Sequence, residues 1–226
     1  MRRMGRIWTW REEAAGAFWE EARTVLKGNG VIAVPTETFY ALAVNPFQAE
    51  ALVRLFALKD RGPEKPVLVL VDGPEMLHQV VREIPGLARR LMEKFWPGPL
   101  SIIFPGLPHL PRRLTGGTGT IAVRQPRQEL TCRLIAALGF PITGTSANRA
   151  GGRPLVRADE VAREFGDHLD LILEAGVCPG GLPSTIVDVT GALPRLVRAG
   201  AVPTAELAEI IPELERFPAK KGAPGD

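Results

Sequence analysis

Residues 47–71 read FQAEALVRLFALKDRGPEKPVLVLV and contain the clearest structural pattern in the chain. The first half places apolar residues at offsets of three and four, the spacing of one helical face, which predicts a helix over residues 47–59. Gly62-Pro63 should end this helix. Residues 67–71 form an unbroken apolar run, which is typical of a strand that is buried on both faces. A helix that leads into a buried strand indicates an α/β protein.

The remainder of the chain alternates between strand-like and helix-like segments. A helix is expected from Glu12 to Lys27, because an apolar stripe with a helical period runs to the Gly28-Asn29-Gly30 turn. At 226 residues, one α/β domain is the simplest arrangement. Further strands are expected near 31–34, 100–104, 120–124, 141–143, 170–173, 185–189 and 195–198. Further helices are expected near 74–83, 86–95, 128–138, 157–165 and 204–211.

Two polar clusters could act together on a ligand. Lys59, Arg61 and Lys65 surround the predicted end of the helix, and Thr145–Asn148 supplies hydroxyl and amide groups later in the chain. Such groups could hold a polyphosphate without a glycine-rich loop. Alternatively, the cations lie on a solvated loop and complement the negative end of the helix, and the second cluster is a turn whose side chains bond their own backbone. The local sequence leaves both interpretations open.

The composition favours an anionic partner without identifying one. The formal net charge is +3 and the pI is about 9.1, which suits ATP or RNA. The basic residues 1–6 precede no apolar segment, so a secretion signal is not expected. No run approaches the ~20 apolar residues of a membrane span. We therefore expect a cytoplasmic protein without a membrane partner.

The cysteines and histidines do not predict a metal site. Cys132 and Cys178 are far apart in sequence and have no partner at metal-ligand spacing, so buried thiols are expected rather than a disulfide. The histidines are scattered in the same way. No zinc-binding pattern follows from their positions.

Several short motifs, taken in their order along the chain, resemble those of the YrdC family. The motifs are VIAVPTETFYALAV at 31–44, KDRGPEK at 59–65, WPGPL at 96–100, TIAVRQP at 120–126, SAN at 146–148, STIVD at 184–188 and LVRAG at 196–200. The resemblance covers roughly residues 10–205. It implies a YrdC-like single domain, an α/β fold with a twisted, largely mixed open sheet flanked by helices around a basic concave cavity. Residues 206–226 would be the end of a C-terminal helix and a flexible tail, in a short form without the extra C-terminal domain of longer relatives.

The YrdC family includes the threonylcarbamoyl-AMP synthases, which begin the threonylcarbamoyladenosine modification of tRNA. The resemblance therefore implies a reaction in which L-threonine, bicarbonate and ATP give threonylcarbamoyl-AMP and pyrophosphate. Mg²⁺ is expected with ATP, carried by the phosphates, because no carboxylate cage is evident in the sequence. Possible further partners are tRNA or another RNA and the downstream tRNA-modification enzymes.

The resemblance also implies roles for individual residues. The implied catalytic residues are Lys59, Arg61, Ser146 and Asn148. The implied ATP-binding residues are Arg61, Lys65, Thr120, Ser146, Arg153 and Arg198. The implied threonine-binding residues are Thr38, Tyr40, Arg124 and Ser184. A guanidinium at Arg124 suits the amino-acid carboxylate because its planar fork accepts both oxygens at once.

Some of these positions have other interpretations or depart from the family pattern. Arg124 could be a surface charge at the end of a strand, and Tyr40 could be a core aromatic. Ala41 stands where many members have glycine, which indicates an ordinary turn. Leu70 stands where many members have a histidine that contacts threonine. The shape of the amino-acid pocket therefore depends on how Leu70 is placed.

Two rival functions share these residues. One is a non-catalytic RNA-binding module of the same fold, in which Lys59, Arg61 and Arg124 bind the phosphodiester backbone and affinity falls steeply with salt. The other is a carbamoyl-transfer domain that uses a donor derived from carbamoyl phosphate. Such domains normally belong to much larger chains, so we favour the synthase.

Overall fold

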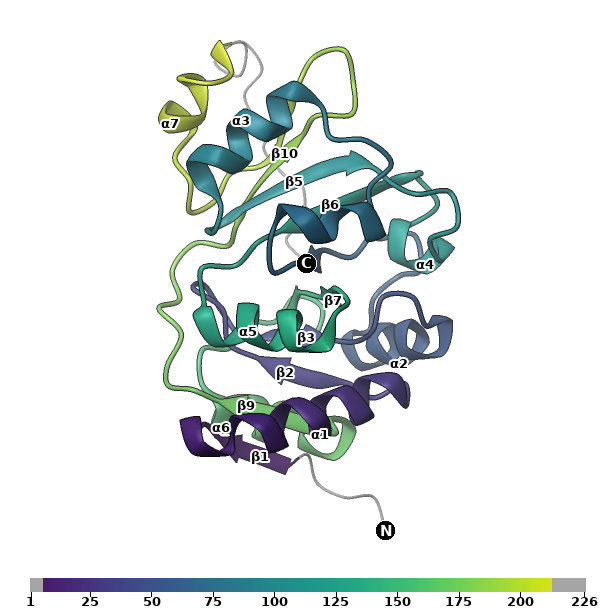
Figure 1. Cartoon of the computed structure of the whole chain (residues 1–226), viewed down its shortest axis with the longest axis vertical. Coiled ribbons are helices and arrows are strands. Elements are labelled where there is room, and N and C mark those ends of the chain that lie inside the picture. The colour runs from purple at the N-terminus through teal and green to yellow at the C-terminus, as the bar shows by residue number, and fades with distance from the viewer. Residues whose placement is uncertain (1–5, 213–226) are drawn as a thin grey trace.

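The computed structural model describes residues 6–212, which fold into two β-sheets with helices around them (Figure 1). The strands are β1 (Arg6–Thr9), β2 (Ile32–Val34), β3 (Ala41–Ala43), β4 (Val69–Leu70), β5 (Leu100–Pro105), β6 (Thr120–Arg124), β7 (Ile142–Thr143), β8 (Thr145–Ser146), β9 (Leu171–Glu174), β10 (Thr185–Asp188) and β11 (Arg195–Arg198). The α-helices are α1 (Ala15–Lys27), α2 (Ala49–Lys59), α3 (Gly86–Phe95), α4 (Arg112–Thr115), α5 (Glu129–Leu138), α6 (Ala158–Phe165) and α7 (Thr204–Ala208). Short 3₁₀ segments are η1 (Glu12–Ala14), η2 (Pro74–Gln79) and η3 (Gly166–His168).

Both sheets contain parallel and antiparallel strand pairs. The five-stranded sheet has the order β1-β9-β2-β3-β8, and the six-stranded sheet has the order β11-β10-β5-β6-β4-β7. The expected mixed α/β class is confirmed. The single open sheet that we expected is instead two sheets. Only one residue separates β7 from β8, but β7 pairs with β4 of the six-stranded sheet and β8 pairs with β3 of the five-stranded sheet.

The two sheets meet at Gly144, the one residue between β7 and β8. Its amide donates to the carbonyl of Leu68 at 2.8 Å, and the amide of Thr143 donates to the carbonyl of Val44 at 3.0 Å. A methyl group at Gly144 would lie 2.4 Å from Cγ of Leu70, which is fully buried. Only a residue without a side chain lets the two sheets approach this closely.

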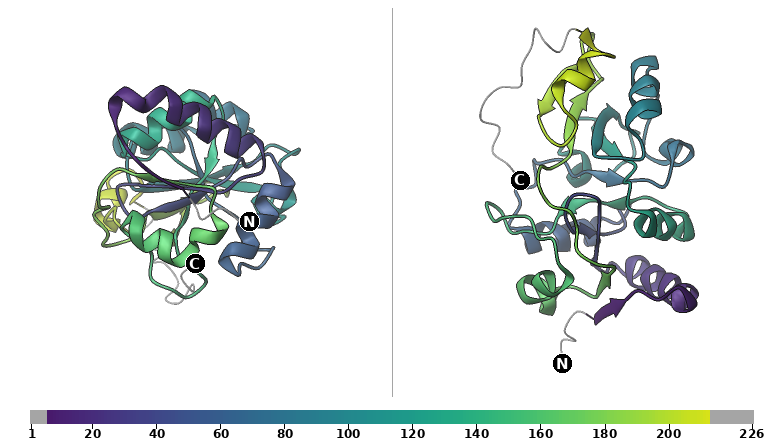
Figure 2. Two further views of the ribbon diagram at one scale, coloured as in Figure 1. Left: turned by 90° about the horizontal axis from the view of Figure 1, so that it is seen from below. Right: turned by 90° about the vertical axis from the view of Figure 1, so that its left-hand side faces the viewer.

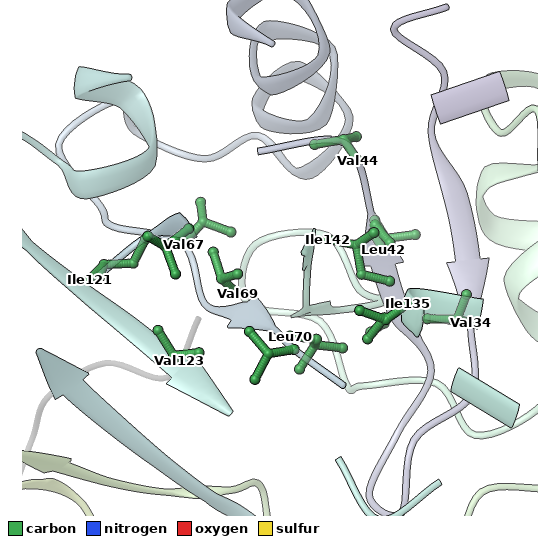
Figure 3. Close-up of a cluster of buried hydrophobic side chains, with 14 of the residues drawn as sticks. Val34, Leu42, Val44, Val67, Val69, Leu70, Ile121, Val123, Ile135 and Ile142 are labelled. Atoms are coloured by element: carbon green, nitrogen blue, oxygen red, sulfur yellow. The ribbon is translucent and has the colours of Figure 1, made fainter. Parts of the chain in front are cut away.

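The hydrophobic core continues from one sheet to the other. Val34 and Leu42 of the five-stranded sheet and Val69 and Val123 of the six-stranded sheet belong to one cluster of buried side chains, which Ile135 of α5 joins (Figure 3). The burial of this apolar surface stabilises the two sheets as one unit.

Helices lie on both sides of the molecule. α3, α5 and α1 lie along one side, and α6 lies on the other (Figure 2). The segment between β9 and β10 passes from the five-stranded to the six-stranded sheet along the left edge of Figure 1. The fold therefore joins both sheets by core contacts, by Gly144 and by this connection.

The sequence did not indicate three strands and one helix that the structure contains. β1, β3 and β8 are short, and β3 and β8 carry no alternation of apolar and polar residues that would mark a half-buried strand. Helix α4 has four residues, too few for a period to show. The three strands form because neighbouring strands supply hydrogen-bond partners for them.

One expected helix ends where it was predicted to end, and another ends earlier. α2 ends at Lys59, because Asp60 adopts a left-handed conformation with φ of 52° and the amide of Arg61 bonds back to the carbonyl of Phe56. The helix expected at 74–83 is the 3₁₀ segment η2. Residues beyond it pair with the end of β5, since the amide of Arg82 donates to the carbonyl of Pro105.

Packed structure continues past the expected boundary at residue 205. Leu207 and Ile211 are buried, so the described domain reaches the end of the described residues. The tail expected within 206–226 falls mostly on residues 213–226, which lie outside the described residues, and it stays a prediction. No helix within residues 6–212 is long and apolar enough to cross a lipid bilayer.

The Gly144→Ala variant should be less stable than the wild-type protein by about 1–3 kcal/mol, the usual cost of overpacking a buried site. The added methyl group would collide with Leu70, whereas the backbone angles of Gly144 lie outside the left-handed region. Urea unfolding measures the difference. The matched control is Gly86→Ala, where the methyl group meets nothing within 4 Å. Equal stability of the two variants would show that the sheets separate easily at Gly144.

Candidate functional site

The end of α2 is bonded to the polar loop that follows β8. Lys59 is only 1% exposed, and its Nζ donates to the carbonyls of Ser146 at 2.6 Å and Asn148 at 2.9 Å. Oδ1 of Asn148 lies at 3.4 Å from the same nitrogen. The two clusters that the sequence analysis linked are therefore in direct contact.

The Asn148 side chain is largely occupied within its own loop. Its Oδ1 accepts the hydroxyl of Ser146, and its Nδ2 donates to the carbonyls of Arg149 at 2.9 Å and Gly152 at 3.0 Å. Lys59 and Asn148 together fix the backbone of this loop. Their roles toward ATP stay predictions, and the structure adds a structural role to each.

Arg61 and Lys65 lie on a loop that packs against the segment before β6. Nη2 of Arg61 donates to the carbonyl of Pro66 at 2.8 Å, while Lys65 is exposed. The amide of Val67 donates to the carbonyl of Leu114, and a methyl group at Gly116 would lie 2.4 Å from the carbonyl oxygen of Glu64. The turn that leads to Thr120 thus lies beside the cationic loop.

One face of the six-stranded sheet collects four of the polar side chains. Directly paired residues project to the same face, and residues two apart along a strand do so too. Pairing places Ile103 beside Ala122, Ser101 beside Ile186, and Ile186 beside Arg198. This face carries Thr120, Arg124, Ser101 and Arg198.

The exposure pattern shows that this face is less covered than the opposite one. Ile103, Ala122 and Ile186 on it are partly exposed. Ile102 and Val123, which project to the other face, are fully buried. A sheet face with polar side chains among partly exposed apolar ones can bind a ligand.

Ser184, Ser101 and Arg198 form a hydrogen-bonded group on this face. Arg198 donates through Nη2 to the carbonyl and the hydroxyl of Ser184, at 2.9 and 3.1 Å. The hydroxyl of Ser184 lies 3.0 Å from that of Ser101, which is fully buried. The sequence analysis did not select Ser101. Ser101 directly follows the Trp-Pro-Gly-Pro-Leu motif and interrupts the apolar run of β5. This pattern could have indicated it from the sequence.

Arg124 forms a buried ion pair with Glu37. Its Nη2 lies 2.7 Å from Oε1 of Glu37, and the two side chains are 5% and 14% exposed. Leu70 pairs with Arg124 in the neighbouring strand and projects to the same face. Arg124 is therefore not a surface charge at the end of a strand, and Leu70 borders it.

The turn that carries Glu37 is held by its own hydroxyl groups and by α5. The hydroxyl of Thr36 donates to the carbonyl of Phe39 at 2.8 Å and lies 3.0 Å from the hydroxyl of Thr38. The hydroxyl of Thr131 donates to the carbonyl of Pro35 at 2.6 Å. Glu37 lies inside the quoted Pro-Thr-Glu-Thr motif, yet the sequence analysis gave it no role.

Tyr40 is a core residue in the structure. It is fully buried, and its hydroxyl donates to the carbonyls of Leu173 at 3.2 Å and Gly176 at 3.3 Å. Burial raises the pKa of this phenol above its ordinary range. The expected wall of an open pocket is thus a packed side chain, because its hydroxyl is needed by two backbone carbonyls.

Arg153 lies apart from the sheet face. Its side chain is 78% exposed and pairs with Glu160 at 3.1 Å. It lines a cavity of about 350 Å³ together with Asn148 and Arg149. The structure thus connects Arg153 with the Asn148 loop and not with Arg124 or Arg198.

The surroundings of the two cysteines raise the pKa of both thiols. Both thiols are free, and burial raises the pKa of Cys132 and of Cys178 to about 11. The negative charge of Glu37 adds to both shifts, so both thiols lie near the Glu37–Arg124 pair. Residues 6–212 contain no group of three or more metal-binding side chains.

The chain is similar to known proteins in sequence and in structure. The sequence model of the Sua5/YciO/YrdC family, described as telomere recombination, matches residues 24–200. The threonylcarbamoyl-AMP synthase of Pyrococcus abyssi is 35% identical over 217 residues, which are 96% of this chain and 62% of that protein. The threonylcarbamoyl-AMP synthase of Thiobacillus denitrificans is 35% identical over 171 residues, 75% of this chain and 90% of that protein.

A solved structure of Pyrococcus abyssi Sua5 complexed with L-threonine has a TM-score of 0.87 and 33% identity to this chain. The alignment covers 92% of this chain and 62% of that one. This chain therefore spans about three-fifths of the Pyrococcus protein, and nearly the full length of the Thiobacillus relative.

The Lys59→Met variant should lose about 2–4 kcal/mol of stability, because the buried carbonyls of Ser146 and Asn148 would lose their donor. Chemical unfolding measures this loss. The matched control is Lys65→Met, which removes the same group from an exposed position and should change stability by no more than about 0.5 kcal/mol. A Lys59 variant as stable as the control would mean that the cost of burying the ammonium outweighs its hydrogen bonds.

Proposed function

The chain belongs to the Sua5/YciO/YrdC family, and from this premise we propose that it synthesises threonylcarbamoyl-AMP from L-threonine, bicarbonate and ATP. Pyrophosphate is the second product. The reaction is the first step of tRNA threonylcarbamoyladenosine modification, so the tRNA-modification enzymes that consume the product are the downstream partners. The location proposed for this reaction is the cytoplasm.

The observation that carries this proposal is the row of polar side chains on one face of the six-stranded sheet. Arg124 on β6 and Arg198 on β11 lie at its two ends, with Ser101 and Ser184 between them. At about 4.8 Å per strand, three strand spacings separate the two backbones by about 14 Å. The product has five bonds from its carboxyl carbon to phosphorus, about 7 Å at roughly 1.4 Å per bond. Two arginine side chains that reach inward can hold both ends of such a molecule.

The proposed chemistry needs no protein nucleophile. Bicarbonate supplies carbon dioxide by losing hydroxide, and the amine of threonine combines with the carbon dioxide to form a carbamate; the proton that the amine loses and the hydroxide give water. A carbamate oxygen then bonds to the α-phosphorus of ATP as the bond to pyrophosphate breaks. Catalysis then depends on positioning and on neutralising the charge that develops at phosphorus. Cationic and hydroxyl side chains suit this task.

The cationic loop is proposed to bind the triphosphate. Arg61 and Lys65 lie beside the turn that leads to Thr120, and all three carry groups that bind phosphate oxygens. Ser146 and Asn148 are proposed to orient the carbamate, on a loop that Lys59 holds in place. Arg153 and Arg198 are proposed as further cations for the nucleotide.

The amino acid is proposed to bind on the other side of the site. Arg124 takes the carboxylate of threonine, and Thr38 and Ser184 offer hydroxyl groups for its side chain. Mg²⁺ is proposed to arrive with ATP as part of the substrate, since the described residues contain no cluster of three metal ligands. Tyr40 supports this side of the site from the core.

Pyrophosphate release from ATP, measured with and without threonine and bicarbonate, tests the proposal. Release that depends on both compounds supports the synthase. An RNA-binding module would release no pyrophosphate, and its affinity for RNA would fall steeply with salt. A carbamoyl-transfer domain would act on a carbamoylated donor without threonine.

The Arg61→Ala variant should form product at least about 100-fold more slowly, the scale on which the loss of one charge-stabilising group acts. Pyrophosphate release at saturating substrates gives the rate. Arg90→Ala on α3, where the side chain is exposed, is the matched control and should keep the wild-type rate. A wild-type rate in the Arg61 variant would remove Arg61 from the mechanism.

The Arg124→Lys variant should raise the KM for threonine about tenfold or more and leave the KM for ATP nearly unchanged. A lysine keeps the charge, but it has no planar fork that can donate to both carboxylate oxygens at once. Steady-state kinetics with each substrate varied in turn separates the two effects. An equal rise in the KM for ATP would mean that Arg124 binds the nucleotide instead.

A further inference from the structure

The Glu37–Arg124 pair has unfilled hydrogen-bonding capacity. Both carboxylate oxygens of Glu37, and Nε and Nη2 of Arg124, are buried without a hydrogen-bond partner of good geometry in the described residues. The 2.7 Å separation is therefore a charge contact and not the bidentate pair that arginine and a carboxylate usually form. Buried polar atoms are almost always satisfied, so these four atoms leave room for hydrogen bonds to a further group.

The net charge of this pair indicates the kind of group. A lone buried arginine would favour an anion, but Arg124 and Glu37 together carry no net charge. A zwitterion matches such a pair, because its negative end meets the guanidinium and its positive end meets the carboxylate. An α-amino acid is a zwitterion whose two charged groups are separated by one carbon atom, which suits two side chains in contact with each other.

We propose that Glu37 binds the α-ammonium group of the amino-acid substrate while Arg124 binds its carboxylate, an inference that rests on the proposed function. Glu37 is then a specificity-determining residue of the amino-acid site. Each of its oxygens can accept an N–H donor, and an ammonium group supplies three. When the amino acid binds, its ammonium and carboxylate groups can form the hydrogen bonds that Glu37 and Arg124 do not form with each other.

The surroundings of Glu37 support a fixed position for this residue. The hydroxyls of Thr36 and Thr131 tie its turn to the carbonyls of Phe39 and Pro35. Because the turn is held on both sides, the carboxylate is presented next to Arg124 with little freedom of the backbone. Because this acceptor is already held in place, little conformational entropy is lost when a ligand binds to it.

A different use of the same contact is that Glu37 blocks Arg124 and must be displaced by the substrate. A blocking carboxylate competes with the substrate carboxylate, so its removal would tighten binding. A carboxylate that binds the ammonium group loses affinity when it is neutralised. The Glu37→Gln variant therefore distinguishes the two by the sign of the effect.

Calorimetric titration with L-threonine and with 3-hydroxybutanoate, which lacks the ammonium group, tests the proposal on the full chain. The wild-type protein should prefer threonine by about tenfold or more, the scale of a charged hydrogen bond. In Glu37→Gln the ratio of the affinity for threonine to the affinity for 3-hydroxybutanoate should fall toward one. Glu37→Asp keeps the charge and should restore part of the preference. Glu93→Gln, at an exposed position on α3, should behave like the wild-type protein.

The ratio of the two affinities is measured on one preparation, so partial unfolding of a variant does not alter it. An unchanged preference in Glu37→Gln overturns the proposal, and so does tighter binding of threonine by that variant. If the wild-type protein does not bind threonine at all, the proposed function fails together with this inference. If it binds threonine and Glu37→Gln keeps the preference, only the role of Glu37 fails.

Discussion

The close approach of the two sheets at Gly144 is the constraint on which the site depends. One residue connects a strand of the six-stranded sheet to a strand of the five-stranded sheet, and the fully buried side chain of Leu70 fills the space that a side chain at Gly144 would need. The chain then continues directly into Ser146 and Asn148, beside β3. Because this junction is fixed, the polar loop can reach the end of α2, where Lys59 binds it.

Two buried cations near this junction, Lys59 and Arg124, have different kinds of partner. Nζ of Lys59, at the end of α2, donates to the backbone carbonyls of Ser146 and Asn148, and the loop with Arg61 and Lys65 follows directly. Arg124 is held by the full negative charge of Glu37. The pairing of Arg124 with Glu37 favours a molecule without net charge, which agrees with the amino acid that we propose to bind there.

The sequence predicted helices where apolar residues recur with a helical period, and strands where apolar residues form an unbroken run. The end of α2 at Lys59 and the strand at 195–198 follow from local patterns. The division into two sheets could not be predicted, because it depends on the contact between Gly144 and Leu70, which are far apart in sequence. The family resemblance named Arg124, but the pairing with Glu37 is a contact between distant segments that no local pattern contains. Ser101 had a local signal in its position on β5, but its contact with Ser184 joins segments that are far apart in sequence.

The fold alone does not decide between a synthase and an RNA-binding module, so the decision lies with the site residues. A surface that binds a phosphodiester backbone needs exposed cations, because these neutralise phosphates and release the counterions of the nucleic acid. Arg124 is instead buried against a carboxylate, and the pair contains four polar atoms without hydrogen-bond partners of good geometry in the described residues. Each unsatisfied buried group costs about 1–3 kcal/mol, so such a pair is expensive unless a ligand completes it. The negative charge of Glu37 would repel a polyanion at Arg124, whereas a small zwitterion can bind both partners. The arrangement at Arg124 therefore argues for an amino-acid site and against a nucleic-acid surface.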